Sequence, residues 1–176
     1  YPEKTWEKKN RELSLTGPYF SPDGTQAVLQ ARAVDNKDRW IASIDLTSGA
    51  LTTLDRQRDE AWIAGPGIGW GGTLGWLPDS KHLYFQSEES GYSHLYLVDV
   101  TTKEKKALTA GKFEVFDPFL SQDKKSWYLT TSEVHPGERH FYRMPLMGGK
   151  MEQLTSMEGE NQVVLSPDEK QLAILH

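Results

Sequence analysis

Residues 77–109 read LPDSKHLYFQSEESGYSHLYLVDVTTKEKKALT, and this stretch decides the fold. Pro78-Asp79-Ser80 is a turn cluster, because proline presets φ and the aspartate and serine oxygens can accept nearby backbone N–H groups. Residues 82–86 and 93–100 are rich in aromatic and β-branched side chains on alternating faces, which predicts two strands. Residues 105–108 predict a third, more polar strand. The stretch is therefore a meander of short antiparallel strands.

The same block of turns and strands recurs along the chain. Four aspartates each precede an apolar strand residue by six positions: Asp23 and Leu29, Asp79 and Phe85, Asp123 and Leu129, Asp168 and Ile174. A second offset, of eight residues, joins Leu46 to Leu54, Val100 to Leu108 and Leu146 to Leu154. The three closing leucines are 54 and 46 residues apart, close to the ~40–50-residue repeat of four-stranded propeller blades.

These offsets predict an all-β fold: a β-propeller fragment of four-stranded antiparallel blades, about three blades plus part of a fourth. One partial domain, 1–176, divides into a leading segment 1–16, blade units 17–64, 73–115 and 116–160, a glycine-rich segment 65–72, and the start of the next blade, 161–176. A blade cannot bury both of its own faces, so most of its aromatic residues are expected to fill the space between blades. These residues are Tyr84, Phe85, Tyr96, Trp127, Tyr128 and Phe141.

The composition excludes several classes of protein and site. Apolar residues make up 37% of the 176 residues, which favours a folded chain, and the absence of cysteine excludes disulfides and thiolate sites. A net charge of -5 without a basic stripe argues against nucleic acid. No apolar run approaches the ~20 residues of a membrane-spanning helix. Because the chain opens on Tyr1, we expect an excised piece of a longer protein, whose uncovered end blades self-associate.

The sequence carries no recognisable catalytic motif. It has no G-x-S-x-G and no H-E-x-x-H. The five histidines show no metal-ligand spacing, and His82 and His94, at strand starts, are expected to be structural or solvent-facing. No catalytic residue, metal site or cofactor is therefore predicted. The pair Glu88-Glu89 could bind an ammonium group, but two solvated acids on a hairpin are the ordinary interpretation.

Gly67-x-Gly69-x-x-Gly72 matches the dinucleotide fingerprint only as a string. That motif requires a helix to begin there, and Gly75 and Pro78 follow too closely. We interpret the region instead as a flexible functional or insertion loop that carries Trp62, Trp70 and Trp76.

Three strings resemble a known family: YFSPDG at 19–24, DEAWI at 59–63 and SEESGYSHLY at 87–96. They are similar to the propeller of the prolyl oligopeptidase family, in particular its dipeptidyl peptidase IV branch. The resemblance covers nearly the whole chain, and the hairpin at 87–96 is its most specific part. Members of the family join this propeller to a C-terminal α/β-hydrolase domain with a Ser-Asp-His triad. Nothing here matches that domain, so no triad residue is carried over.

The resemblance implies a non-catalytic propeller that shapes and gates peptide access to an active site in the absent hydrolase domain. The implied partners are that domain, the remaining blades and a peptide substrate. By its position the glycine-rich segment resembles a family loop that faces the substrate cavity, which makes Gly69, Trp70 and Gly71 the candidate site residues. Glu88-Glu89 belongs to a different motif from the amine-anchoring glutamates of the branch. The alternative is a TolB-like propeller that binds a protein partner. The sequence leaves the compartment open, and the resemblance points to a periplasmic or other extracytoplasmic location.

Overall fold

The computed structural model describes residues 11–69 and 72–176. Every regular element in these residues is a β-strand. The described residues contain no helix long and apolar enough to cross a membrane. The first sheet contains β1 (Leu13–Phe20), β2 (Ala27–Ala33), β3 (Asp38–Ile44) and β4 (Leu51–Arg58). The second contains β5 (Leu74–Trp76), β6 (His82–Ser87), β7 (His94–Asp99) and β8 (Lys105–Ala107). The third contains β9 (Val115–Leu120), β10 (Ser126–Thr131), β11 (His140–Pro145) and β12 (Glu152–Gln153), followed by β13 (Gln162–Leu165) and β14 (Leu172–Leu175).

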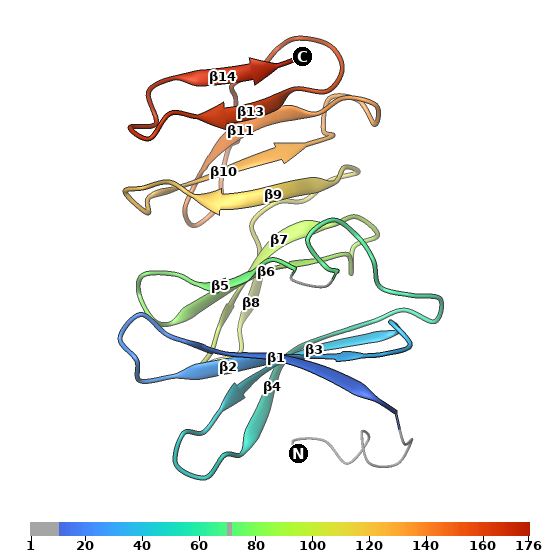
Figure 1. The fold of residues 1–176 in the computed structure, drawn as a ribbon, viewed down its shortest axis with the longest axis vertical. Coiled ribbons are helices and arrows are strands. Elements are labelled where there is room, and N and C mark those ends of the chain that lie inside the picture. The colour runs from blue at the N-terminus through green and yellow to red at the C-terminus, as the bar shows by residue number, and fades with distance from the viewer. Residues whose placement is uncertain (1–10, 70–71) are drawn as a thin grey trace.

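Each sheet is an antiparallel meander in chain order. Three sheets have four strands, and β13 and β14 form a two-stranded sheet. Figure 1 shows the four sheets stacked one after another in chain order along the longest axis, with the N-terminus at one end and the C-terminus at the other. Consecutive four-stranded sheets that cover each other's faces are the blades of a propeller, so the predicted partial β-propeller is confirmed.

The sequence pattern does not predict the first strand of each complete blade. The strands β1, β5 and β9 contain Gly17-Pro18, Gly75 and Pro118, and such residues argue against a strand when only the sequence is read. The strand β1 begins at Leu13, inside the leading segment 1–16, and β9 begins at Val115, the last residue of unit 73–115. Both strands therefore extend across the predicted boundaries between units.

The recurring aspartates close the turns that the sequence assigned to them. The Asp23 carboxylate accepts hydrogen bonds from Ser21 Oγ (2.6 Å) and Thr25 N (3.0 Å). Asp123 accepts from Ser121 Oγ (2.7 Å) in the same way. These hydrogen bonds, from the serine first, lower the pKa of both aspartates. The six-residue offset thus reflects a turn that starts the second strand of each blade at a fixed position.

Four of the six aromatic residues predicted to fill the space between blades lie in clusters shared by two sheets: Tyr84, Phe85, Tyr96 and Trp127. The rings of Tyr128 and Phe141 stack on each other within the third sheet. One buried cluster joins the first two sheets through Val28, Ile41, Phe85 and Tyr96. A second joins the second and third sheets and includes Trp127, whose ring meets Tyr84 edge-on at 4.8 Å between centroids. The face-to-face contact of neighbouring sheets, rather than any single sheet, therefore supplies the core.

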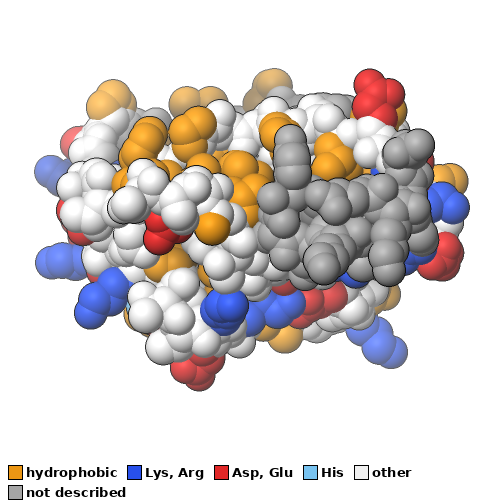
Figure 2. Space-filling view, turned by 90° about the horizontal axis from the view of Figure 1, so that it is seen from below, with side chains coloured by type: hydrophobic (Ala, Val, Ile, Leu, Met, Phe, Trp, Pro, Cys, Tyr) orange, Lys and Arg blue, Asp and Glu red, His pale blue; other side chains and the backbone are white. Residues whose placement is uncertain are grey.

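The two ends of the stack leave apolar surface exposed. At the C-terminal end, Val164 and Leu175 are each 70% exposed, and β14 pairs only with β13 among the described residues. Figure 2 views the other end and shows apolar side chains on the surface there. An unpaired edge beside exposed apolar side chains favours pairing with another chain.

We therefore expect the chain to self-associate, by packing of end blades or by exchange of terminal strands. Light scattering over a range of protein concentrations should show a mass above that of one chain. The Leu175→Lys variant, which places a charge at the free edge, should shift the equilibrium toward monomer. Met147→Lys, at an exposed turn of the third sheet, is the control and should not. A wild-type chain that stays monomeric at the highest concentration would contradict this prediction.

Candidate functional site

The candidate site is the loop of residues 59–73, which connects β4 of the first blade to β5 of the second. It contains the glycine-rich segment 65–72. In an antiparallel meander the β2–β3 and β6–β7 hairpins lie at the same end of the blades as this loop. Of the three candidate residues, Gly69 is described; it is half-buried, and its carbonyl accepts a hydrogen bond from Gly72 N (3.0 Å). Trp70 and Gly71 lie outside the described residues.

The first blade holds the loop through a buried arginine. Arg32, near the end of β2, donates to the carbonyl oxygens of Ile63 (2.5 Å) and Ile68 (2.6 Å), and its Nε donates to Asn36 Oδ1 (3.0 Å). Asn36 in turn accepts the Ile63 N–H at its own carbonyl (2.8 Å). The side chains of Ile63 and Ile68 are 1% and 0% exposed. This part of the loop is therefore tied to the β2–β3 hairpin.

The second blade holds the loop from its other side. Gln86 on β6 accepts a hydrogen bond from Thr73 Oγ1 (2.6 Å), and Ser93 Oγ donates to the Pro66 carbonyl (2.6 Å). Gly67 has φ +67° and lies so close to Gln86 that an added Cβ would come within 1.8 Å of Gln86 Oε1. Glycine is required there by both the backbone conformation and the space.

The prediction that this region is a flexible loop carrying Trp62, Trp70 and Trp76 is wrong for Trp76, and Trp70 lies outside the described residues. Residues 63–68 are anchored to both blades by the contacts above. Trp62 is on the loop and is 66% exposed, but Trp76 is the last residue of β5. Its indole N–H donates to the Tyr19 carbonyl (3.0 Å), which joins the first two blades. A glycine-rich composition predicted backbone freedom, whereas the buried polar groups around the loop remove it.

A second buried arginine lies beneath the loop. Arg39 on β3 is fully buried and donates to Gln30 Oε1 (2.8 Å) and to the Gln86 carbonyl (2.9 Å). Burial lowers its pKa to about 10, although nearby Asp55 opposes this shift. Neither Arg32 nor Arg39 was predicted from the sequence as a residue of the site. The available signal was a charged residue inside a strand whose other residues are apolar.

Glu88 and Glu89 do not act as a pair. Glu88 accepts the Ala64 N–H (3.2 Å), and Glu89 forms an ion pair with Lys105 (2.5 Å). Lys105 also pairs with the buried Asp55 of the first blade (2.9 Å), and these two carboxylates raise its pKa against the opposing effect of burial. Both glutamates border a cavity of about 490 Å³ between β4 and the β6–β7 hairpin. Their contacts serve to join the blades and the loop.

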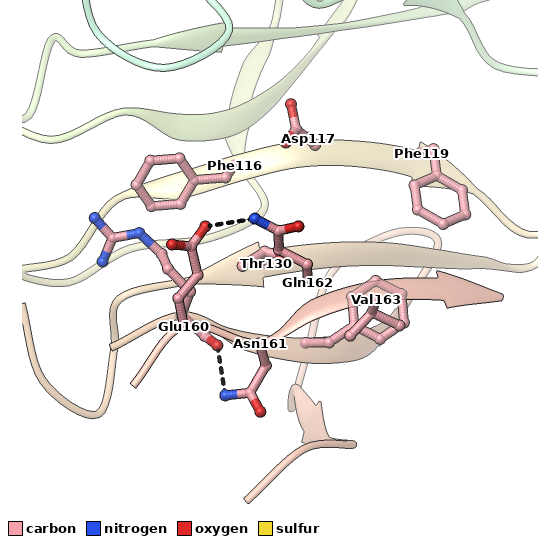
Figure 3. A pocket seen from close by; sticks show the side chains of 10 residues that line it. Phe116, Asp117, Phe119, Thr130, Glu160, Asn161, Gln162 and Val163 are labelled. Atoms are coloured by element: carbon pink, nitrogen blue, oxygen red, sulfur yellow. Dashed lines mark hydrogen bonds between the residues drawn. The ribbon is translucent and has the colours of Figure 1, made fainter. Parts of the chain in front are cut away.

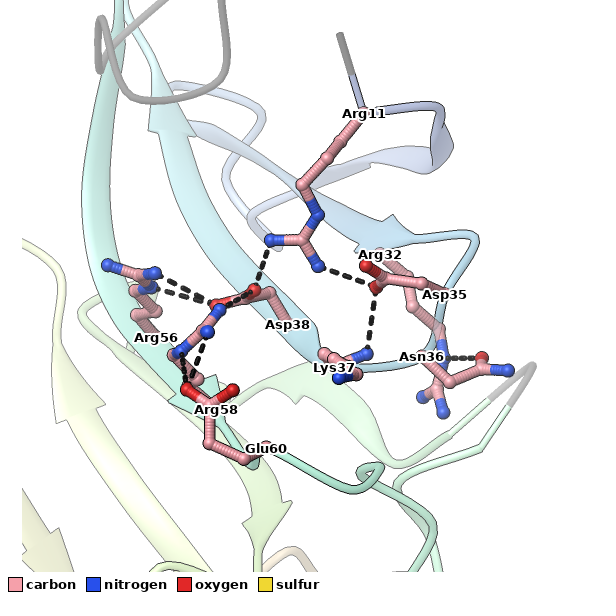
Figure 4. Close-up of polar contacts among 9 residues, drawn as sticks. All are labelled: Arg11, Arg32, Asp35, Asn36, Lys37, Asp38, Arg56, Arg58 and Glu60. Atoms are coloured by element: carbon pink, nitrogen blue, oxygen red, sulfur yellow. Dashed lines mark hydrogen bonds and ion pairs between the residues drawn. The ribbon is translucent and has the colours of Figure 1, made fainter. Parts of the chain in front are cut away.

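A cluster of ion pairs flanks the start of β3. The fully buried Asp38 carboxylate accepts hydrogen bonds from Arg11, from Arg56 (2.9 and 3.1 Å) and from Arg58 (2.6 Å), as Figure 4 shows. Burial raises the pKa of Asp38, but the arginines outweigh it, so that the pKa lies below its ordinary value. The cluster ties Arg11, two residues before β1, to the end of β4 and so closes the first blade on the side of the loop.

The buried histidines close the next two blades at the equivalent place. His94, 1% exposed, contacts Thr109 Oγ1 (3.0 Å) and the Gly111 carbonyl (3.1 Å). His140, 2% exposed, contacts the Thr155 carbonyl (3.1 Å) and Glu138 (2.8 Å). Both roles are structural, and the described residues contain no group of His, Asp and Glu that could hold a metal ion.

A second hollow, of about 390 Å³, lies between the third sheet and β13. Figure 3 shows Phe116, Phe119, Thr130 and Gln162 around it. The guanidinium of Arg139 lies over the Phe116 ring, 4.4 Å from its centroid. The lining of this hollow combines aromatic faces with a few charged groups, and it includes none of the candidate site residues.

Comparison with known proteins finds a family whose sequence profile matches this chain. The sequence profile described as "Dipeptidyl peptidase IV (DPP IV) N-terminal region" matches residues 4–175. Two curated proteins named "Probable dipeptidyl peptidase 4" are similar to the chain. The protein from Aspergillus clavatus is 35% identical over 109 residues, covering 58% of this chain and 14% of the relative. The protein from Neosartorya fischeri is 31% identical over 122 residues, covering 66% and 15%. The chain therefore spans about one seventh of the length of these relatives.

Two solved structures share the fold. A Bacteroides ovatus protein described as a dipeptidyl aminopeptidase IV superposes with a TM-score of 0.70 and 18% identity, covering 92% of this chain and 25% of that one. TolB from Acinetobacter baumannii superposes with a TM-score of 0.56 and 22% identity, covering 93% and 38%. At these identities the two likenesses establish the propeller fold alone.

Proposed function

The chain belongs to the family of dipeptidyl peptidase IV N-terminal regions, and from this premise we propose that it is the propeller portion of a serine exopeptidase. In this proposal the propeller is not catalytic. It shapes and gates the access of peptides to an active site in a C-terminal α/β-hydrolase domain outside these 176 residues. Short peptides enter through the propeller, whereas folded chains are excluded by size.

The anchoring of residues 63–68 within this loop is the observation that carries this proposal. A loop that contacts substrate must keep its shape while the ligand enters and leaves. Arg32 and Ser93 hold the loop by hydrogen bonds of 2.5 to 2.6 Å from two different blades. We propose that Gly69, Trp70 and Gly71, which follow the anchored residues 63–68 in the chain, face the peptide.

The test of the gating role uses the full-length protein encoded by the parent gene. The gene downstream of His176 should contain a G-x-S-x-G motif. The purified protein should cleave a chromogenic Xaa-Pro or Xaa-Ala dipeptide and leave intact a folded protein with the same N-terminal dipeptide. Trp70→Ala should raise KM with kcat unchanged, because it removes only binding. Leu46→Ala, in an exposed turn at the opposite end of the blades, is the control and should change neither.

Cleavage of the folded protein at the rate of the short peptide would contradict the gating role. Absence of the motif would contradict the assignment to a peptidase. In that case a propeller that binds a protein partner becomes the better account.

The 176-residue chain by itself is predicted to show no turnover of these chromogenic dipeptides. It contains no nucleophile elbow, and its buried histidines are engaged in structural hydrogen bonds. The assay should follow release of the chromophore by the purified chain, with a commercial serine peptidase as the positive control. Turnover that survives repurification and is blocked by a serine-directed reagent would overturn the prediction.

A further inference from the structure

Arg32 is a buried arginine whose guanidinium binds backbone carbonyl oxygens. It is 4% exposed, and its guanidinium donates to three oxygens, two of which are carbonyl oxygens of the loop of residues 59–73. Among the described residues no carboxylate lies within ion-pair distance of it, although Glu88 is near enough to act on it electrostatically. Burial lowers its pKa, and Glu88 opposes that shift. A buried cation without an ion-pair partner is costly, so its hydrogen bonds must compensate for the lost water.

The two carbonyls are held in a fixed relation to each other. The guanidinium is planar, so its two terminal nitrogens hold Ile63 O and Ile68 O at a set spacing, five residues apart in the chain. The intervening backbone, which includes Pro66 and Gly67, must then follow one path. A lysine at the same position would offer a single nitrogen and could not reproduce this fork.

The same arginine connects the loop to the β2–β3 hairpin. Its Nε donates to the side chain of Asn36, whose backbone has φ +58°, a left-handed conformation that asparagine tolerates. Figure 4 shows this contact between Arg32 and Asn36. Arg32 therefore fixes the loop and the adjacent hairpin together.

We infer that Arg32 is a positioning residue: it fixes the conformation of residues 63–68 of the loop and, through them, the affinity for peptide. The second half of this inference rests on the proposed function, in which residues 69–71 face the substrate. Arg32 itself is buried and does not touch the peptide. Its loss raises KM and leaves kcat unchanged.

Hydrogen exchange in the chain as it stands tests the first half. In the wild type, the Ile63 and Ile68 amides should exchange more slowly than those of the exposed 88–91 turn. In Arg32→Lys and Arg32→Met, exchange over residues 60–69 should accelerate on the order of ten- to a hundredfold, as expected for losing hydrogen bonds from a charged donor. Exchange in β10 should stay unchanged and reports that the fold is intact.

Arg143→Lys is the matched control. Arg143 lies on β11, donates to Ser126 Oγ (3.2 Å) and makes no contact with the loop, so exchange over residues 60–69 should not change. Faster exchange in β10 would show that Arg32→Met unfolds. In that case the inference is tested by loop exchange in Arg32→Lys and by the comparison of the loop with the exposed turn in the wild type. The inference is overturned if exchange over residues 60–69 is unchanged in a folded Arg32 variant. It is also overturned if these residues exchange in the wild type as fast as the exposed 88–91 turn.

Steady-state kinetics of the full-length protein test the second half. Arg32→Lys should raise KM for a chromogenic dipeptide with kcat unchanged, a split that general destabilisation would not produce. A lowered kcat at constant KM overturns the positioning role. Faster loop exchange with an unchanged KM keeps Arg32 as the anchor of the loop and overturns only the proposed contact between the loop and the substrate. The two failures are therefore distinguishable.

Discussion

The Trp127→Ala variant is expected to lose about 3–5 kcal/mol of the free energy of unfolding. Trp127 is fully buried between the second and third blades. Its indole N–H donates to the Leu146 carbonyl (2.9 Å), and its ring packs edge-on against Tyr84. Truncation removes the largest side chain of this interface, leaves a cavity there and leaves a carbonyl without its donor.

Urea denaturation followed by circular dichroism measures this loss. Trp62→Ala is the control, because Trp62 is 66% exposed and its removal should change the free energy of unfolding by no more than about 0.5 kcal/mol. Equal effects of the two substitutions would show that the interface between the second and third blades does not stabilise the chain as the packing indicates.

The Asp38→Asn variant is expected to be the second most destabilised, at the lower end of the about 3–5 kcal/mol that follows the loss of one partner from a buried ion pair. Asp38 is 0% exposed and is the shared acceptor for Arg11, Arg56 and Arg58, which are 18%, 40% and 33% exposed. Removing its charge leaves three neighbouring cations that repel one another. Their partial exposure to water limits the cost. Asp35→Asn is the matched control: Asp35 pairs with the same Arg11 but is 46% exposed, so about 1 kcal/mol or less is expected.

The pH dependence of stability gives an independent check on Asp38. Its pKa in the folded chain lies below the ordinary value, so the unfolded chain binds the proton first as the pH falls. The stability that the charge contributes is therefore fully present above about pH 4, the ordinary aspartate pKa, and is lost as the pH falls through the lower folded pKa. The difference in unfolding free energy between wild type and Asp38→Asn should shrink over that acidic range. A difference that stays constant down to the lowest pH would contradict the assignment.

The sequence alone determined the repeat, the turns and most of the strands of this protein. Asp23, Asp123 and their equivalents accept hydrogen bonds from residues within five positions of their own, and side chains of a strand alternate with a period of two residues. Both features therefore leave a local pattern in the sequence. The aromatic residues between blades were predicted for the same reason, since a repeating two-faced sheet must be covered on both faces. The strands β1 and β9 were missed because Pro18 and Pro118 interrupt that local pattern.

Only the tertiary structure decided how the candidate loop is held. Arg32 reaches its loop carbonyls across 31 and 36 residues, and Asp38 reaches Arg11 across 27. The glycine-rich composition of this segment predicts backbone freedom when its neighbours are unknown. Among residues 63–68, contacts with Arg32, Gln86 and Ser93 remove that freedom. Contacts of this kind depend on which blades lie side by side, and no periodicity in the chain encodes the partner of a single buried charge.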